Sequence, residues 1–199
     1  MRVLIGCEMS GIVRDAFLSK GHDVWSCDVI PTLKPGPHII NDVRNILDWN
    51  WDLAVFFPPC THLASSGARW FPQKRWEQKE ALKFVRLLMN APIPRIAIEN
   101  PVGVISTAIR KPDQIIQPWQ FGEDASKKTC LWLKNLPPLY PTKMVFKERY
   151  ANQTPSGQNN LPPSEDRAMK RSLTYAGIAN AMADQWLSAQ ATLWDFFFL

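Results

Sequence analysis

The chain has 199 residues, of which 46% are hydrophobic, and its net charge is +5. This size and composition predict one domain with its own core, and no apolar run approaches the roughly eighteen residues of a membrane span. Four widely spaced cysteines and three histidines without a cysteine cluster argue against a disulfide framework and a metal site. The first six residues are too short for a signal peptide. We therefore expect a cytoplasmic protein that binds neither membrane nor metal.

The N-terminal part of the chain alternates strand-like and helical segments. Residues 2–11 have the pattern of a strand followed by a turn, and residues 12–19 have helical spacing that ends at Gly21. Residues 23–27 form the next strand-like segment, which is closed by Asp28. This order of strand, turn, helix, strand and acid is the opening of a Rossmann-like unit.

The same alternation continues through the middle of the chain. Residues 76–90 have the apolar spacing of an amphipathic helix. Short apolar segments typical of buried strands lie on both sides of it, at residues 38–42, 52–57 and 95–98. Strands that alternate with helices predict an α/β fold with a mostly parallel sheet flanked by helices.

The pattern loosens after residue 102. Residues 111–122 look irregular, residues 129–133 resemble a strand, and residues 172–186 end in a helix. Between the last two, residues 134–166 are rich in proline, asparagine, glutamine and serine, which is typical of loops.

The turn after the first strand and two later acids suit a nucleoside-type ligand. Glycine lets a backbone approach a ligand, and the following helix adds its dipole, although a bare turn would have the same glycines. An acid after the second strand stands where a ribose diol is held. The acid after the third strand suits an adenine amino group, or equally an N-cap. The residues concerned are Gly6, Glu8, Ser10, Gly11, Asp28 and Asp42.

A cysteine and a glutamate follow two neighbouring strand segments. Cys60 comes after two prolines that stiffen its loop, and Glu99 comes directly after residues 95–98. Ligands bind outside the carboxyl ends of strands in such sheets, so thiol and carboxyl would face one cleft. This pairing suits addition to an electron-poor ring. The alternatives are a small buried hydrophobe for the cysteine and a structural salt bridge for the glutamate; His62 either lowers the thiol pKa or is a loop histidine.

The basic side chains are unevenly distributed. Seven basic and two acidic residues fall between Arg69 and Arg95, whereas residues 1–68 have more acids than bases. A polyanion lying over the active edge would explain this excess, and solvated helix faces are the alternative.

These motifs resemble those of the DNA cytosine-5 methyltransferase family. Phe57-Pro-Pro-Cys60 resembles the family's Pro-Cys nucleophile motif, and Glu99-Asn100-Pro101 resembles its Glu-Asn-Val motif with proline in place of valine. Residues 127–133 resemble the basic motif that begins a late strand, with lysines where arginines are usual, and residues 177–182 resemble the closing Gly-Asn-Ala-Val motif. The whole chain also looks like short methylase-like proteins of phages and prophages.

The resemblance implies a Rossmann-like, S-adenosylmethionine-dependent methyltransferase fold and cytosine-containing DNA as partner. It divides the chain into a catalytic domain, residues 1–133 plus 170–199, and a loop-rich minimal recognition region, residues 134–169. Cys60 would attack cytosine C6, Glu99 would stabilise the ring, and Asn100 would position the loop that carries Glu99. The cofactor would contact Pro58 and Asn180 besides the six residues above. DNA would contact the basic residues Arg69, Arg75, Lys127 and Lys128.

Other functions remain open from the sequence. The chain could be a non-catalytic DNA-binding relative, such as a decoy in phage–host conflict, because its cofactor loop is poor in glycine. It could also modify cytosine in single strands or free nucleotides, because the recognition region is short. A cysteine hydrolase ranks third, since no Asn or Asp is obviously placed to orient His62.

Overall fold

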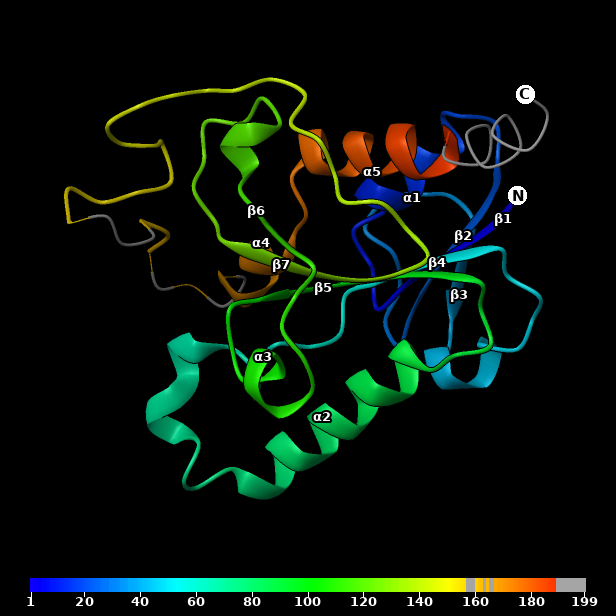
Figure 1. Ribbon diagram of the computed structural model, residues 1–199, viewed down its shortest axis with the longest axis horizontal. Coiled ribbons are helices and arrows are strands. Elements are labelled where there is room, and N and C mark those ends of the chain that lie inside the picture. Colours follow the sequence, from blue (N-terminus) through cyan, green and yellow to red (C-terminus); the bar gives the residue numbers. More distant parts are fainter. Residues whose placement is uncertain (157–159, 163, 165–166, 189–199) are drawn as a thin grey trace, which may run out of the picture.

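The computed structural model describes residues 1–156, 160–162, 164 and 167–188. A seven-stranded sheet in the order β3-β2-β1-β4-β5-β7-β6 forms the centre of the molecule (Figure 1). Its strands are β1 (Arg2–Gly6), β2 (Asp23–Asp28), β3 (His38–Ile40), β4 (Leu53–Phe56), β5 (Arg95–Pro101), β6 (Gln114–Ile116) and β7 (Thr129–Lys134).

The first five strands are parallel, as the alternation of strands and helices predicted. β1 lies between β2 and β4, and β5 follows on the other side of β4. All residues of β4 are buried, which is typical of a parallel strand covered on both faces. β7 then runs antiparallel to both β5 and β6. The predicted mostly parallel α/β fold is therefore confirmed.

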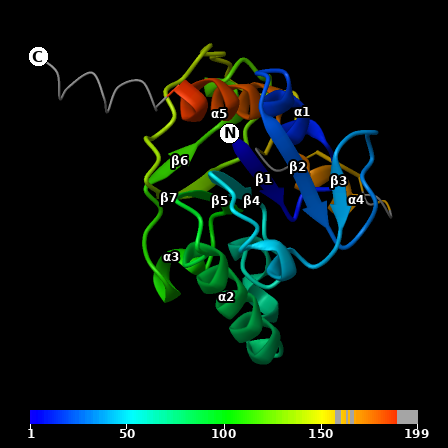
Figure 2. The same ribbon diagram turned by 90° about the vertical axis from the view of Figure 1, so that its right-hand side faces the viewer.

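Helices cover both faces of the sheet. α1 (Ile12–Leu18) and α5 (Ala176–Ser188) lie on one face, and α2 (Arg75–Met89) and α3 (Ile105–Ala108) lie on the other (Figures 1 and 2). Alternate strand side chains point to opposite faces and build two cores. Phe17 and Trp186 belong to the first core, and Leu88 belongs to the second. None of the helices in these parts of the chain is long and apolar enough to cross a membrane.

Most predicted boundaries agree with the structure. Gly21 ends the first helix as expected, with a left-handed φ of 78° and its N–H donated to the Leu18 carbonyl at 2.9 Å. β3 is shorter than predicted, because Asn41 and Asp42 leave the strand to begin the 3-10 turn η1 (Val43–Ile46). Two further 3-10 turns are η2 (Ser65–Trp70) and η3 (Pro118–Gln120).

Two elements differ from the sequence prediction. β6 lies in the segment expected to be irregular; three residues are too few to show a period, and β6 exists only because β7 offers it a backbone partner. α4 (Arg167–Ser172) forms within and just after the stretch read as loops. The part of the predicted catalytic domain beyond residue 188 lies outside the described residues.

Candidate active site

The site lies at the edge where the parallel strands end. β1, β4 and β5 run in register with their carboxyl ends together, and α4 lies on that side of the sheet (Figure 1). Cys60 is four residues beyond the end of β4. Glu99 was expected just after its strand, but β5 extends to Pro101, and Glu99 is a strand residue opposite Leu131. The antiparallel neighbour β7 explains this extension, because it supplies backbone partners as far as Pro101.

The loop that carries Cys60 is attached to the end of β5. Asn100, which is 1% exposed, donates from Nδ2 to the Pro58 carbonyl at 2.8 Å. The Val104 N–H donates to the Leu63 carbonyl at 2.9 Å, and the Ser65 N–H donates to the Val102 carbonyl at 2.9 Å. Asn100 was expected to position the loop of Glu99; its hydrogen bond instead holds the loop of Cys60, because Glu99 is already fixed within the strand.

The charge of Glu99 acts on the Cys60 thiol. Loss of water around the Cys60 sulfur and the nearby Glu99 carboxylate raise the thiol pKa, and the charges of Lys127 and Arg171 lower it. Burial likewise raises the pKa of Glu99, against Lys127 and the Thr129 hydroxyl. The Lys127 charge thus lowers the pKa of both side chains.

The other three cysteines differ from Cys60. Cys60 is exposed, whereas Cys27 and Cys130 are buried and Cys7 is half-buried. Burial raises the pKa of Cys7 far above its usual range, and burial and Asp28 raise the pKa of Cys27 to about 11. Among the four, Cys60 is thus the thiol that a substrate can reach.

The predicted DNA-contacting residues do not share one place. The Lys127 ammonium donates to the Arg171 carbonyl at 2.9 Å and to the Leu173 carbonyl at 3.4 Å, so it clamps the end of α4. Lys128 is exposed beside it. Arg69 and Arg75 are exposed on η2 and at the start of α2, away from β7 in sequence and on the other layer. Arg171 was missed by the sequence analysis, because nothing within its own segment links it to Cys60.

The loop after β1 is built from its own hydrogen bonds. The buried Glu8 carboxylate accepts from the Ser10 hydroxyl and, at 3.2 Å, from the Gly11 N–H. The Ser10 oxygen also accepts from the Ile12 N–H at 3.1 Å, at the start of α1. Burial raises the pKa of Glu8, and these donors oppose the shift. Glu8 and Ser10 thus hold the loop in shape.

Glycine stands at two positions of this loop for different structural reasons. A Cβ on Gly6 would lie 2.5 Å from the Phe56 ring, so close packing against β4 requires glycine there. Gly11 has a left-handed φ of 75°, and a Cβ would meet the Arg14 guanidinium at 2.5 Å. Neither observation requires a ligand, although both allow one.

Arg14 is a buried charge that the sequence analysis did not single out. It is fully buried and pairs with Asp15 at 2.8 Å. Its guanidinium also donates to the Thr32 hydroxyl at 3.2 Å and to the Pro35 carbonyl at 3.2 Å. The segment between β2 and β3 is thereby fixed over the loop after β1, where the Leu33 N–H reaches the Met9 carbonyl.

The predicted cofactor acids lie close to that loop. After burial, the charges on Asp28 and Asp42 contribute to the raised pKa of Cys7 in the turn after β1. Asp42 N-caps η1 and pairs with Arg44, which lowers the pKa of Asp42. Asp28 accepts at 3.4 Å from the Ile30 N–H. Asp28 therefore keeps capacity to accept from ribose hydroxyls, and this donor and acceptor set fits an adenosine-type cofactor.

The last predicted cofactor residue lies elsewhere on the surface. Asn180 is exposed on α5, the helix that packs against α1.

Among the residues that the structure describes, no group of three or more His, Cys, Asp or Glu side chains is arranged for a metal ion.

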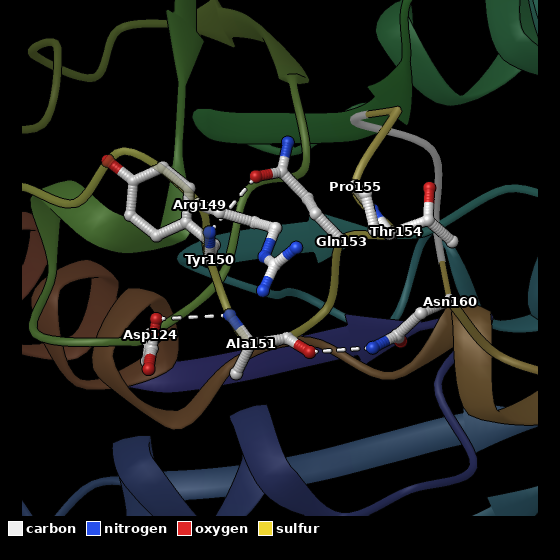
Figure 3. A pocket seen from close by; sticks show the side chains of 8 residues that line it. All are labelled: Asp124, Arg149, Tyr150, Ala151, Gln153, Thr154, Pro155 and Asn160. Atoms are coloured by element: carbon white, nitrogen blue, oxygen red, sulfur yellow. Dashed lines mark hydrogen bonds between the residues drawn. The ribbon is translucent and has the colours of Figure 1, made fainter.

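A hollow of about 550 Å³ lies in the loop-rich segment before α4 (Figure 3). Its walls include Asp124, Arg149 and Tyr150, with the Arg149 guanidinium directed into the hollow. Asn152, between the wall residues Ala151 and Gln153 in the sequence, exchanges hydrogen bonds of 2.9 Å with the backbone of Ser126, next to Lys127. Neither Cys60 nor Glu99 lines this hollow.

Comparison with known proteins supports the fold. No protein-family profile matches the chain, and no curated protein matches it. A methyltransferase of Entamoeba histolytica, EhMeth, aligns over 73% of this chain and 57% of its own, with 15% identity and a TM-score of 0.51. Two other structures have lower TM-scores. A prophage-encoded DNA modification methyltransferase of E. coli aligns over 73% of this chain and 52% of its own, with 12% identity and a TM-score of 0.47. DNMT2 of Spodoptera frugiperda aligns over 72% of this chain and 54% of its own, with 15% identity and a TM-score of 0.42.

The sheet order and this similarity together define the class of fold. The chain has the Rossmann-like fold of S-adenosylmethionine-dependent methyltransferases, and the resemblance inferred from the sequence is confirmed at that level. The chain spans little more than half the length of the structures it matches. Its activity, substrate and partners are therefore matters for proposal.

Proposed function

We propose that this protein transfers a methyl group from S-adenosylmethionine to C5 of cytosine in DNA through a covalent bond to Cys60. The observation that carries the proposal is the pairing of an exposed thiol with a half-buried carboxyl group. Cys60 follows β4 and Glu99 lies within β5, two neighbouring parallel strands, and the Glu99 charge acts on the thiol.

The chemistry needs both groups. Cytosine C5 is a poor nucleophile until the Cys60 sulfur bonds to C6, which moves an electron pair toward C5. A protonated Glu99 hydrogen-bonds ring N3 and so accepts part of the developing charge. Bound S-adenosylmethionine supplies an electrophilic methyl group. Loss of the C5 proton to a base then expels the thiolate and restores the ring.

The pKa directions fit these roles. Burial raises the pKa of Glu99, so the carboxyl keeps a proton to higher pH than a free glutamate, as a donor to N3 requires. The raised pKa of Cys60 means that the resting thiol is protonated at neutral pH. A Glu99 carboxyl group that holds its proton has no negative charge, so it would not exert the repulsion on the Cys60 thiolate that an ionised Glu99 exerts.

The cofactor is assigned to the loop after β1. Asp28 would accept from the ribose hydroxyls, the N-terminus of α1 and the loop of Gly6, Glu8, Ser10 and Gly11 would face the methionine part, and Pro58 would border the methyl group. The Asp42 carboxylate already accepts from the Arg44 guanidinium, so Asp42 would contribute less than Asp28 to cofactor binding. Asn180, exposed on α5, would contact the cofactor only at its edge.

DNA would contact basic residues in two places: η2 with the start of α2, and the segment just before β7. Arg69, Arg75 and Lys128 would contact phosphates, which give affinity without a sequence code. The loop-rich segment 134–169 would act as a minimal recognition region, with Arg149 in the hollow of Figure 3. An arginine fork is the commonest reader of a guanine edge.

A second candidate is methylation of cytosine in single strands or free nucleotides. The shortness of the segment between β7 and α4 favours it, because a flipped base in a duplex needs extensive contacts elsewhere.

Mass analysis of nucleosides after incubation with labelled S-adenosylmethionine tests the proposal. Duplex DNA, single strands and deoxycytidine monophosphate are compared. Label in 5-methylcytosine supports the reaction, and the preferred substrate separates the two candidates. No label in any pool, with DNA still bound, would favour a non-catalytic relative.

A further inference from the structure

The end of α4 is fixed directly beside the candidate active site. Lys127 donates two hydrogen bonds from its ammonium to carbonyls of Arg171 and Leu173, at 2.9 and 3.4 Å. Carbonyls at a helix C-terminus lack partners within the helix, and a lysine ammonium satisfies them well. The Lys127 charge is therefore used by the protein itself, and its position determines where Arg171 lies.

Arg171 and Cys60 are attached to the same end of β5. Lys127 precedes β7 by two residues, and Thr129 of β7 lies opposite Pro101. On the other side, Asn100 holds the Pro58 carbonyl, two residues before Cys60. The charge of Arg171 reaches the Cys60 sulfur, in agreement with this geometry.

Arg171 differs from Lys127 in being available to a ligand. Its side chain is exposed, and no carboxylate within the described parts of the chain forms an ion pair with it. Of the acids nearby, Glu99 is engaged with Lys127 and Thr129. An unpaired guanidinium beside a nucleophile and a ring-binding carboxyl group is suited to a planar or tetrahedral anion.

We infer that Arg171 binds the phosphate group of the nucleotide whose base lies against Cys60. The inference rests on the proposed function for the identity of the base, and it adds a phosphate subsite to that site. The phosphate belongs either to a polynucleotide backbone or to a free nucleotide, and Arg171 recognises the same group in both. The guanidinium fork would fix the sugar–phosphate on one side while Glu99 holds the ring on the other.

The test is a double-mutant cycle between Arg171 and the phosphate. Affinity is measured by fluorescence anisotropy for single-stranded oligonucleotides with one cytosine, in which either flanking phosphate is replaced by a neutral methylphosphonate. For the wild type, one replacement should weaken binding roughly tenfold or more, as expected for a charge-assisted contact. R171A should lose a similar factor with the native oligonucleotide and then be insensitive to that replacement.

Two further variants make the test decisive. R171K keeps the charge but not the fork, so it should fall between the wild type and R171A. K20A removes one positive charge at the opposite edge of the sheet, where Lys20 pairs with Asp184, and should leave the coupling unchanged. If R171A remains as sensitive to methylphosphonate as the wild type, the inference is wrong. Thermal melts verify that each variant is folded.

A second arm identifies the source of the phosphate and separates this inference from the proposed function. If deoxycytidine monophosphate but not deoxycytidine competes with the oligonucleotide for binding, and R171A loses this competition, the subsite belongs to free nucleotides. If neither compound competes but the coupling is present in the oligonucleotide, the subsite belongs to a polynucleotide backbone. Coupling without any methylation would retain the phosphate subsite and refute the proposed reaction. Methylation without coupling would support the proposed reaction and refute the phosphate subsite.

Discussion

The two loops at the carboxyl edge of the sheet are built in opposite ways. In the loop after β1 and the helix α1 that follows it, buried charges are satisfied within the protein: Glu8 by Ser10 and Gly11, and Arg14 by Asp15 and the segment between β2 and β3. In the loop after β4, Cys60 is exposed. Nearby, Asn100 Oδ1 and His62 Nδ1 are buried without a hydrogen-bond partner among the described residues.

This difference separates groups that maintain shape from groups available for chemistry. A buried polar atom without a partner costs free energy, and among the side chains that the structure describes this cost falls on His62 and Asn100. Substitutions in the loop after β1, whose buried polar groups are hydrogen-bonded, should change the stability of the fold. Substitutions in the loop after β4 should change the reactivity of Cys60. The predictions below test this division.

Substitution of Cys60 should have the largest effect. Cys60→Ser should lower methylation roughly a thousandfold or more, because a hydroxyl is a far weaker nucleophile than a thiolate. Thermal stability and S-adenosylmethionine affinity, measured by calorimetry, should change little. DNA with 5-fluorocytosine should trap the wild-type protein covalently, and peptide mapping should find the adduct on Cys60. An adduct on Cys7, Cys27 or Cys130 would overturn the assignment.

Glu99→Gln should lower the methylation rate roughly a hundredfold. The amide keeps the shape of the carboxyl group but cannot protonate the ring, and general acid catalysis is typically worth that factor or more. Single-turnover rates give the chemical step directly. A rate within threefold of the wild type would mean that Glu99 has only a structural role.

Arg14→Met should affect stability and spare reactivity. Removing one partner of a buried, multiply bonded charge typically costs about 3 kcal/mol, and here it also releases Asp15 and the segment around Pro35. Urea denaturation should show this loss, while alkylation of Cys60 proceeds at the wild-type rate. A matched substitution, Arg44→Met, removes only an exposed pair and should cost less than about 1 kcal/mol.

Asp28→Ala should weaken S-adenosylmethionine binding by roughly tenfold, as expected for one charge-assisted hydrogen bond. Asp42→Ala should weaken it less, because Asp42 is occupied by Arg44. Calorimetric titration gives both affinities. Equal affinity in wild type and Asp28→Ala would remove Asp28 from the cofactor site.

The smallest effect concerns the pH dependence of the thiol. Burial and, after it, the ionised Glu99 raise the pKa of Cys60, so the thiolate forms only at higher pH than in a free cysteine. Glu99→Gln removes that repulsion, and the alkylation rate by iodoacetamide should reach its midpoint at lower pH. Lys127→Ala removes a stabilising charge and should move the midpoint to higher pH. No shift in either variant would mean that the three side chains are not in one site.

Local pattern was enough to predict the order of strands and helices up to residue 101. Apolar runs bounded by turns identify β1, β2, β4 and β5, and four buried residues in β4 require cover on both faces. The positions of Cys60 and Asp28 at strand ends follow from the same pattern. These features depend only on residues near one another in sequence.

Tertiary structure decided everything that depends on a distant partner. β6 exists because β7 pairs with it, and Glu99 lies within β5 because β7 extends that strand. Asn100 holds the loop of Cys60 because that loop crosses the end of β5. The end of α4 at Arg171 is held next to β7 because Lys127, forty-four residues earlier, donates to the Arg171 carbonyl. Such contacts join segments whose spacing in sequence carries no signal, since their stability comes from packing and hydrogen bonds that form only once the sheet is assembled.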